Sequence, residues 1–216
     1  MAGLFITMEG CEGAGKTLQC KKLAACLSER GLPALLTREP GGNRVSERIR
    51  EIILDTEHKN MSARAEALLY SASRAQLVAE IISPALAEGK IVVCDRFTDS
   101  SVAYQGCARG LGAGAIKQIN GFATGYLNPD VTFFLDVDPS VSFARKRNDT
   151  VFDRIELEKP DFHHKVYEGY LGIAKSEPGR VFAIDARKNP DAVHGEILSV
   201  ILPIIEKKFP KGAESE

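Results

Sequence analysis

The chain has 216 residues, which suits one sizeable hydrophobic core, and we expect a single domain over residues 1–216. Its 44% hydrophobic and 26% charged residues are typical of a soluble globular protein, and the formal net charge of -1 provides no basic field for binding DNA or RNA. The five cysteines form no C-x-x-C pair and no run approaches the roughly 18 apolar residues of a membrane span, so we expect a cytoplasmic protein with reduced thiols and neither a nucleic acid nor a membrane as partner.

The first predicted strand and helix are joined by a glycine-rich motif. A short apolar run from Phe5 leads into G-x-x-x-x-G-K-T at residues 10–17, and an amphipathic pattern over 17–30 follows. Glycines in such a turn adopt positive φ, so successive N–H groups form a row of donors at a helix N-terminus, where an anion is favoured. We therefore predict a phosphate-binding loop in which Lys16 reaches the β- and γ-phosphates and the Thr17 hydroxyl binds Mg²⁺. The predicted cofactor-binding residues are Gly10, Cys11, Glu12, Gly13, Ala14, Gly15, Lys16 and Thr17.

Strand and helix patterns alternate through the middle of the chain. Ser62 is a good N-cap for a long helix that reaches about residue 87, and Pro84 can kink it. A fully apolar strand then leads into Asp95 and Arg96. The predicted segments are a strand at 34–37, a polar strand end at 38–42, a helix at 45–54, a surface connection at 55–61, a helix at 62–87 and a strand at 91–94.

The same alternation fills the second half of the chain. A helix that begins near Ser140 runs into a cationic cluster at 145–147, and a polar loop carries the chain to Asp153 and Arg154. The other predicted segments are a helix at 99–105, a glycine-rich loop at 106–114, a helix at 115–124, a strand at 131–136, a helix at 161–175, a strand at 181–185, a helix at 190–208 and a polar tail at 210–216.

Five apolar strands that alternate with helices predict an α/β fold, namely a three-layer P-loop NTPase fold with a five-stranded parallel sheet and helices on both faces. Ligands of such sheets bind beyond the carboxyl ends of the strands. Because residues 10–17, 38–42, 95–96 and 185–187 each follow a predicted strand, we expect them to converge on one rim.

A phosphate-binding loop alone does not distinguish a kinase from a GTPase switch or a motor. No N-K-x-D type tetrad for reading guanine occurs between Asp95 and Lys208, which argues against a GTPase. The small size and two basic segments favour phosphoryl transfer to a small acceptor. The alternatives are a different nucleotide or deoxynucleoside kinase, and a phosphate-loop regulatory protein that binds nucleotide and hydrolyses it slowly.

Five stretches of the chain, at residues 9–17, 37–42, 69–74, 95–106 and 153–156, carry a family resemblance. In sequence, order and spacing they resemble the bacterial thymidylate kinases of the nucleoside monophosphate kinase group, over nearly the whole chain. The resemblance implies a Mg²⁺-dependent enzyme that transfers the γ-phosphoryl of ATP to dTMP, giving dTDP and ADP in dTTP biosynthesis. It also implies a short mobile lid at about residues 145–156 and a homodimer formed through helices that flank the acceptor site.

The resemblance assigns the base pocket to particular side chains. Tyr70 and Arg74 are four residues apart on one helix face, so an aromatic plane and a guanidinium can meet a flat base together. In the family the aromatic residue stacks on thymine and the arginine bonds a thymine carbonyl, although taken alone the pair could be an ordinary half-buried tyrosine and a solvated arginine. By resemblance Ser100, Ser101 and Gln105 also line this pocket, with Tyr104 either in the core or facing the ribose.

Two arginines are expected to bind the phosphate of the acceptor. Arg96 offers a rigid fork for bidentate capture of a phosphate, and the family implies that it clamps dTMP with help from Arg50, which could equally be a surface charge. By resemblance Glu12 meets the acceptor's 3′-hydroxyl and Glu39 lies on the acceptor side. Asp95 has a direct catalytic role or simply holds Arg96 or a Mg²⁺-bound water.

In the family that the chain resembles, the branches differ in where the catalytic guanidinium sits. Because the loop interior at 11–14 contains no arginine, the resemblance implies that the lid supplies this charge. Arg147 is the first choice and Arg154 the second, whereas Arg145 and Lys146 could be a solvated helix end. The predicted catalytic residues are Lys16, Arg96, Arg147 and Arg154. The four histidines show no ligand spacing, so we predict no metal besides Mg²⁺.

Overall fold

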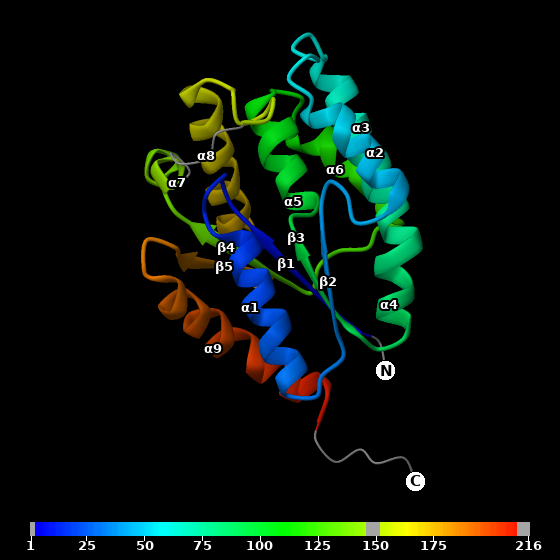
Figure 1. The fold of residues 1–216 in the computed structure, drawn as a ribbon, viewed down its shortest axis with the longest axis vertical. Coiled ribbons are helices and arrows are strands. Elements are labelled where there is room, and N and C mark those ends of the chain that lie inside the picture. The colour runs from blue at the N-terminus through cyan, green and yellow to red at the C-terminus, as the bar shows by residue number, and fades with distance from the viewer. Residues whose placement is uncertain (1–2, 146–151, 211–216) are drawn as a thin grey trace.

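The computed structural model describes residues 3–145 and 152–210, and its centre is a five-stranded parallel sheet (Figure 1). The strands lie in the order β2-β3-β1-β4-β5, and the central pairs run in register with Leu4 opposite Ile91 and Ile6 opposite Val131. Their bounds are β1 Leu4–Glu9, β2 Ala34–Arg38, β3 Ile91–Asp95, β4 Val131–Asp136 and β5 Val181–Asp185. The predicted α/β fold is confirmed.

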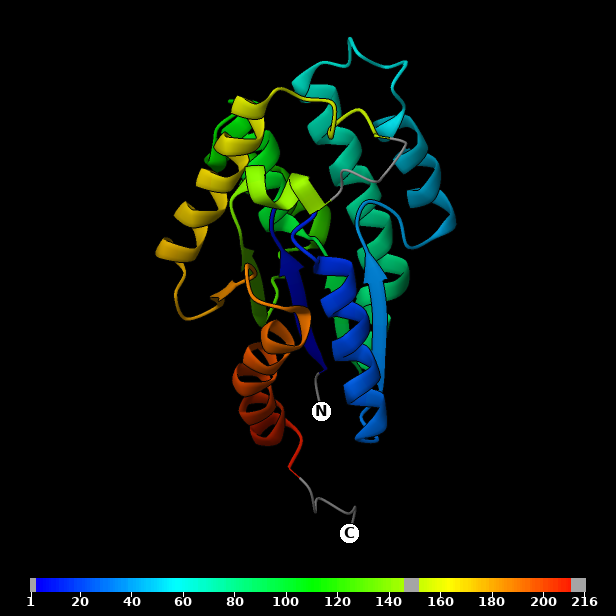
Figure 2. The same cartoon turned by 60° about the vertical axis from the view of Figure 1, so that its left-hand side comes forward.

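Helices cover both faces of the sheet, because side chains alternate along each strand. On one face Leu4, Ile6 and Met8 of β1 pack against α1 (Lys16–Glu29) and α9 (Pro190–Lys208), which lie side by side in Figures 1 and 2. On the other face Phe5 packs beneath the long helix from α3 and a second cluster gathers around Phe134. Every residue of β1 and β3 is buried, as expected for strands whose two faces are both covered by helices.

The remaining helices are α2 Arg44–Leu54, α3 Ala63–Leu77, η1 Val78–Ile82, α4 Ser83–Ala87, α5 Thr98–Ser101, η2 Val102–Ala108, α6 Ala113–Thr124, α7 Pro139–Arg145 and α8 Pro160–Ser176. The predicted N-cap at Ser62 is confirmed, since its hydroxyl accepts a hydrogen bond from the Ala65 N–H at 3.2 Å. None of the helices in these described ranges is long and apolar enough to cross a membrane.

Two predicted helices differ in detail from the structure. The helix at 62–87 contains the π-helical turn η1 just before Pro84, which has no N–H to donate to Glu80 and so favours a shifted hydrogen-bond pattern. The helix at 99–105 instead spans 98–108 through η2, and the predicted loop at 106–114 is correspondingly shorter. There the Gly112 N–H donates to the Gly106 carbonyl at 2.9 Å. This bond closes the turn, so that α6 packs against η2.

The predicted lid is only partly within the described residues. The structure shows its beginning, where α7 ends at Arg145, and its end at 152–156, whereas Lys146 and Arg147 lie outside the described ranges. The carboxyl ends of β1, β2 and β3 meet at the edge of the sheet where α7 also lies, so the phosphate loop and the polar strand ends do share one rim.

Candidate active site

The phosphate loop wraps around a hollow at the end of β1. Gly10, Gly13 and Gly15 have φ of 142°, 73° and 96°, and a Cβ on Gly10 would lie 2.9 Å from the Leu135 carbonyl oxygen. Both the conformation and the close approach therefore require glycine at position 10. The buried Lys16 donates from Nζ to the Cys11 carbonyl at 2.7 Å, and this burial lowers the pKa of Lys16.

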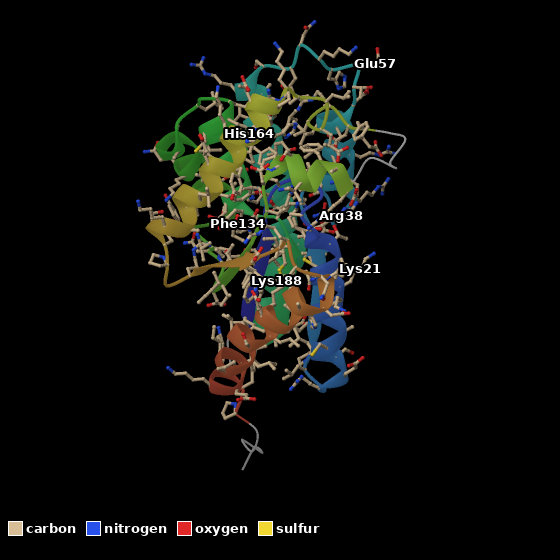
Figure 3. The ribbon with its side chains drawn as sticks, turned by 90° about the vertical axis from the view of Figure 1, so that its left-hand side faces the viewer. Lys21, Arg38, Glu57, Phe134, His164 and Lys188 are labelled. Carbon is tan, nitrogen blue, oxygen red and sulfur yellow. The ribbon has the colours of Figure 1, made fainter. Side chains whose placement is uncertain are left out.

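The hollow beside this loop, here called the loop hollow, gathers cations and oxygen ligands. It has a volume of about 370 Å³ and its lining includes Lys16, Arg38 and Arg145. Figure 3 shows Arg38 beside the N-terminal end of α1. The Thr17 hydroxyl donates to Asp95 Oδ2 at 2.5 Å, which places two hard oxygen ligands together at its edge. The arrangement suits a polyphosphate with a hard divalent cation.

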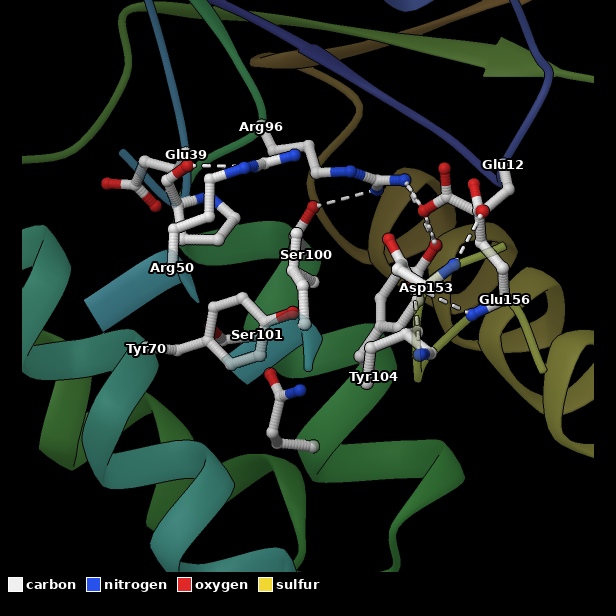
Figure 4. A pocket seen from close by; sticks show the side chains of 14 residues that line it. Glu12, Glu39, Arg50, Tyr70, Arg96, Ser100, Ser101, Tyr104, Asp153 and Glu156 are labelled. Carbon is white, nitrogen blue, oxygen red and sulfur yellow. Dashed lines mark hydrogen bonds and ion pairs between the residues drawn. The ribbon is translucent and has the colours of Figure 1, made fainter. Parts of the chain in front are cut away.

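A second hollow, here called the Tyr70 pocket, adjoins the loop hollow (Figure 4). Its volume is about 200 Å³, and it is lined by Glu12, Glu39, Pro40, Arg50, Leu54, Tyr70, Arg96, Ser100, Ser101, Tyr104, Gln105, Asp153, Ile155 and Glu156. Glu12, Glu39, Arg50 and Arg96 line both hollows. The two hollows therefore adjoin, and the guanidinium groups of Arg50 and Arg96 lie at this junction.

The walls of the Tyr70 pocket come from separate elements. In Figure 4 the half-buried Tyr70 ring of α3 lies on one side and the Arg96 guanidinium on another, with Ser100 between them. Gln105 comes from η2, and Arg50 from α2 donates to the Pro40 carbonyl at 2.9 Å. A flat ring at Tyr70 and an anionic group at the junction would fit together in this space.

Arg96 is held in an unusual conformation at the junction. Its φ of 71° is in the left-handed region, which a non-glycine residue adopts only where its surroundings enforce it. Nη1 donates to the Gly10 carbonyl at 2.9 Å and to the Ser100 hydroxyl at 3.2 Å, while Nη2 forms an ion pair with Glu12 and donates to the Tyr104 hydroxyl at 3.1 Å. The guanidinium is thus fixed beside the phosphate loop before any ligand arrives.

Glu9 supports the site from beneath, and sequence reasoning missed it. This fully buried carboxylate accepts hydrogen bonds from the Phe97 N–H at 2.7 Å, the Ser100 hydroxyl at 2.5 Å and the Tyr170 hydroxyl at 2.9 Å. Burial, followed by the nearby charge of Asp99, raises the pKa of Glu9 to about 7. Its only sequence signal is a charged residue at the end of an apolar strand, immediately before the first loop glycine.

Arg74 lies behind the Tyr70 pocket and is not among its lining residues. Its side chain is 1% exposed and donates to Glu39 at 2.8 Å, to the Ser101 hydroxyl at 3.0 Å, to Asn120 Oδ1 at 2.6 Å and to the Phe97 carbonyl at 3.1 Å. Arg74 therefore braces Ser101 and Glu39 from beneath. A buried arginine of this kind would be costly without such partners.

The sequence and the fold that carry these two hollows can be compared with those of known proteins. The profile of the thymidylate kinase family matches residues 8–197. The chain belongs to the thymidylate kinase family. It is 48% identical over 208 residues to a thymidylate kinase of Geobacillus sp., covering 95% of this chain and 99% of that one. It is 47% identical over 204 residues to one of Ligilactobacillus salivarius, covering 93% and 98%. A crystal structure of thymidylate kinase from Ehrlichia chaffeensis superposes with a TM-score of 0.77 at 33% identity, covering 93% of this chain and all of that one.

The lid arginines of this thymidylate kinase lie in different surroundings. Arg145 lines the loop hollow and donates to the Ala186 carbonyl at 2.9 Å. Arg154 lines neither hollow; it is 7% exposed, and its side chain donates to the Ile53 carbonyl at 2.8 Å and pairs with Glu66 at 2.8 Å. Arg147 is outside the described residues. Of the arginines within the described lid ends, Arg145 is the one that faces the phosphate loop.

The far end of the lid also contributes to the Tyr70 pocket. Asp153, Ile155 and Glu156 line it, and burial raises the pKa of Asp153. The stretch that contains them stood out in the sequence, but only Arg154 was given a role. Since a turn projects neighbouring side chains in different directions, the sequence alone did not show that the acidic and apolar neighbours of Arg154 face the pocket.

Proposed function

We propose that this thymidylate kinase transfers the γ-phosphoryl group of ATP to dTMP, giving dTDP and ADP for dTTP synthesis. The observation that supports the proposal is that the two hollows adjoin and share Arg96 and Arg50 in their linings. A nucleotide in each hollow would place phosphate against phosphate at that junction. The names of the relatives support dTMP as the acceptor.

The loop hollow supplies the donor side of the proposal. Its backbone N–H groups and Lys16 would hold the β- and γ-phosphates. Thr17 and Asp95 offer oxygen ligands that fit Mg²⁺, directly or through water. When bound there, Mg²⁺ would neutralise charge on the phosphates.

The Tyr70 pocket supplies the acceptor side. Tyr70 would stack on thymine. The polar side chains around the base would be Ser100, Ser101 and Gln105. Arg74 lies behind them and would exchange one of its present hydrogen bonds for one to a thymine carbonyl. At the other end Arg96 and Arg50 would grip the acceptor phosphate, while Glu12 and Tyr104 would face its sugar and Glu39 its phosphate end. Positioning of this kind provides most of the catalysis in phosphoryl transfer.

The lid at about 145–156 would close over the joined phosphates and exclude water. We assign the charge that stabilises the transferred phosphoryl group to Arg147. Arg145, which lines the loop hollow, would add a second positive charge there. The contacts of Arg154 support a structural role for it instead, because its side chain is engaged with Ile53 and Glu66.

A coupled assay of ADP release tests the function. We expect fast turnover with dTMP and ATP, and little with CMP or thymidine as acceptor. Turnover of thymidine without turnover of dTMP would identify a deoxynucleoside kinase instead. Slow ATP hydrolysis that no acceptor accelerates would identify a nucleotide-binding regulatory protein.

We also propose that the enzyme is a cytoplasmic homodimer. All five cysteines are free thiols, which suits a reducing compartment. Helix α3 packs against both α2 and α6. The exposed apolar side chains on and just after these helices are here called the α2–α3–α6 patch. The patch consists of Val45, Ile52, Leu68 and Phe122 on the helices and Tyr126 just after α6. Exposed apolar side chains concentrated on one group of helices support a partner surface there.

A further inference from the structure

A buried carboxylate, Glu66 of α3, lies behind the inner wall of the Tyr70 pocket. It is 0% exposed and forms ion pairs with Arg109 at 3.0 Å and with Arg154 at 2.8 Å. Its third partner is the amide of Gln105, whose Nε2 donates to Glu66 Oε1 at 3.0 Å. Burial alone would raise the pKa of Glu66, but the hydrogen bonds from Arg109 and Gln105 and the two positive charges outweigh it and lower the pKa. The carboxylate therefore stays ionised at neutral pH.

An ionised carboxylate can only accept hydrogen bonds, so it dictates which way the Gln105 amide faces. The NH₂ group must point toward Glu66, because the opposite orientation would bring the amide oxygen against the carboxylate oxygens. The carbonyl Oε1 is then turned away from Glu66. Gln105 is 2% exposed and lines the Tyr70 pocket, and within the described residues its Oε1 accepts no hydrogen bond.

A buried acceptor in a binding pocket selects for a donor on the ligand, since an unmatched polar group there is costly. Thymine and uracil carry an N–H at ring position 3, whereas cytosine has an unprotonated nitrogen at that position. Resting on the dTMP kinase activity proposed above, we propose that Glu66 is a positioning residue that fixes the carbonyl of Gln105 as an acceptor, so that the pocket takes thymine or uracil and rejects cytosine. The carboxylate acts through Gln105 and does not itself touch the base.

The other partners of Glu66 explain why this orientation is stable. Arg109 stacks its guanidinium 4.4 Å from the centre of the Phe162 ring and also pairs with Glu158 at 2.5 Å. Arg109 is thus anchored independently of Glu66. Within the described residues, Arg109 and Arg154 each reach Glu66 without bonding to the Gln105 side chain, so loss of one arginine leaves an ionised Glu66 still facing the amide.

The test compares kcat/KM for dTMP, dUMP and dCMP in the wild type, Glu66→Gln and Arg109→Met. In Glu66→Gln the neutral amide permits Gln105 to turn over, so we expect the dTMP to dCMP ratio to fall by about tenfold, the effect of one hydrogen bond. The dTMP to dUMP ratio should stay unchanged, because both bases carry the same N–H. Arg109→Met is the matched control, which also removes an ion pair of Glu66 but should keep both ratios.

The outcomes separate a positioning role from a structural one. An equal loss of kcat/KM for all three nucleotides in Glu66→Gln, with the ratios unchanged, would overturn the inference. If Glu66→Gln does not fold, Gln105→Met leaves Glu66 with both arginines and must show the same fall in the dTMP to dCMP ratio; an unchanged ratio there would equally overturn it. A wild type that phosphorylates dCMP in preference to dTMP would instead refute the proposed function.

Discussion

At the scale of single residues, Glu9 connects the phosphate loop to the acceptor side. It ends β1, immediately before Gly10, and accepts hydrogen bonds from the segment that carries Ser100 and from Tyr170 of α8. Since Ser100 in turn contacts Arg96, the position of the junction guanidinium depends on this carboxylate. Its raised pKa makes the connection sensitive to pH.

We predict that Glu9→Gln changes how the free energy of unfolding depends on pH. Because the pKa of Glu9 is raised from 4.5 to about 7 in the folded protein, the folded state binds more protons than the unfolded state between these values. This contribution to stability is present below pH 4.5 and is lost as pH rises through 7. Urea unfolding of both proteins from about pH 5 to pH 8 should therefore show the wild type losing stability relative to Glu9→Gln. Glu206→Gln, at an exposed position, is the control, and parallel curves for wild type and Glu9→Gln would contradict the prediction.

The residues that sequence reasoning placed best are those whose role follows from backbone geometry. The loop glycines, Lys16 and Thr17 are recognisable because a phosphate loop needs these residue types at this spacing. Glu66 was not recognised, because an acidic residue in the first turn of a helix is already explained by the helix dipole. Its partners Gln105 and Arg154 are 39 and 88 residues away in the chain, so only the folded structure shows the contact.

At the scale of elements, the phosphate loop depends on the close packing of Gly10, which follows β1, against the Leu135 carbonyl of β4. We predict that Gly10→Ala lowers the free energy of unfolding by about 1–3 kcal/mol and weakens ATP binding, because its Cβ would press on the Leu135 carbonyl at a φ of 142°. Gly195→Ala in α9 is the matched control, since its Cβ meets nothing within 4 Å. That variant should gain about 0.5–1 kcal/mol, as alanine does in helix interiors. Denaturant unfolding and nucleotide titration measure both, and equal effects of the two substitutions would contradict the argument.

The lid should separate into a catalytic and an anchoring arginine. Arg154→Met removes a partner of the buried Glu66, so we expect a loss of about 3 kcal/mol of stability. Arg147→Met should leave the unfolding midpoint unchanged and lower kcat by about 100-fold or more, as expected for loss of a transition-state charge. Thermal unfolding and steady-state kinetics of the two variants decide between the roles. A large loss of kcat in a fully stable Arg154→Met would restore Arg154 as the catalytic residue.

The boundaries of most elements could be predicted because the sequence carries their physical signals. Apolar runs marked every strand, and β4, β5 and α9 begin and end where predicted. The π-helical segment η2 was not predicted, because its hydrogen bonds, such as Arg109 N–H to the Tyr104 carbonyl at 2.9 Å, leave no mark on the periodicity of so short a helix.

At the scale of the whole molecule, the α2–α3–α6 patch bears on assembly. Val45 and Ile52 are seven residues apart on α2, so they lie on one face of that helix, and Phe122 on α6 is 90% exposed. We predict that Phe122→Glu converts a homodimer into a monomer, because burying a charge in an apolar interface is costly. Light scattering after size-exclusion chromatography measures the mass in solution. Val141→Glu on α7, also an exposed apolar side chain, is the control that should stay dimeric, and a monomeric wild type would refute the proposed dimer.

The parallel sheet also fixes where the two ends of the described chain lie. Gly3 enters β1 at the amino edge of the sheet, and Lys208 at the end of α9 lies 3.5 Å from Asp130, which precedes β4 at that same edge. Figures 1 and 2 show the start of β1 and the end of α9 on the side of the molecule away from the N-terminal end of α1. An affinity tag, fluorophore or surface linker attached beyond either of these points would therefore leave the chain at the edge of the sheet opposite the two hollows. Immobilised on a sensor chip by one end, the enzyme should leave the loop hollow and the Tyr70 pocket facing the solution. It should then bind nucleotides as it does when free.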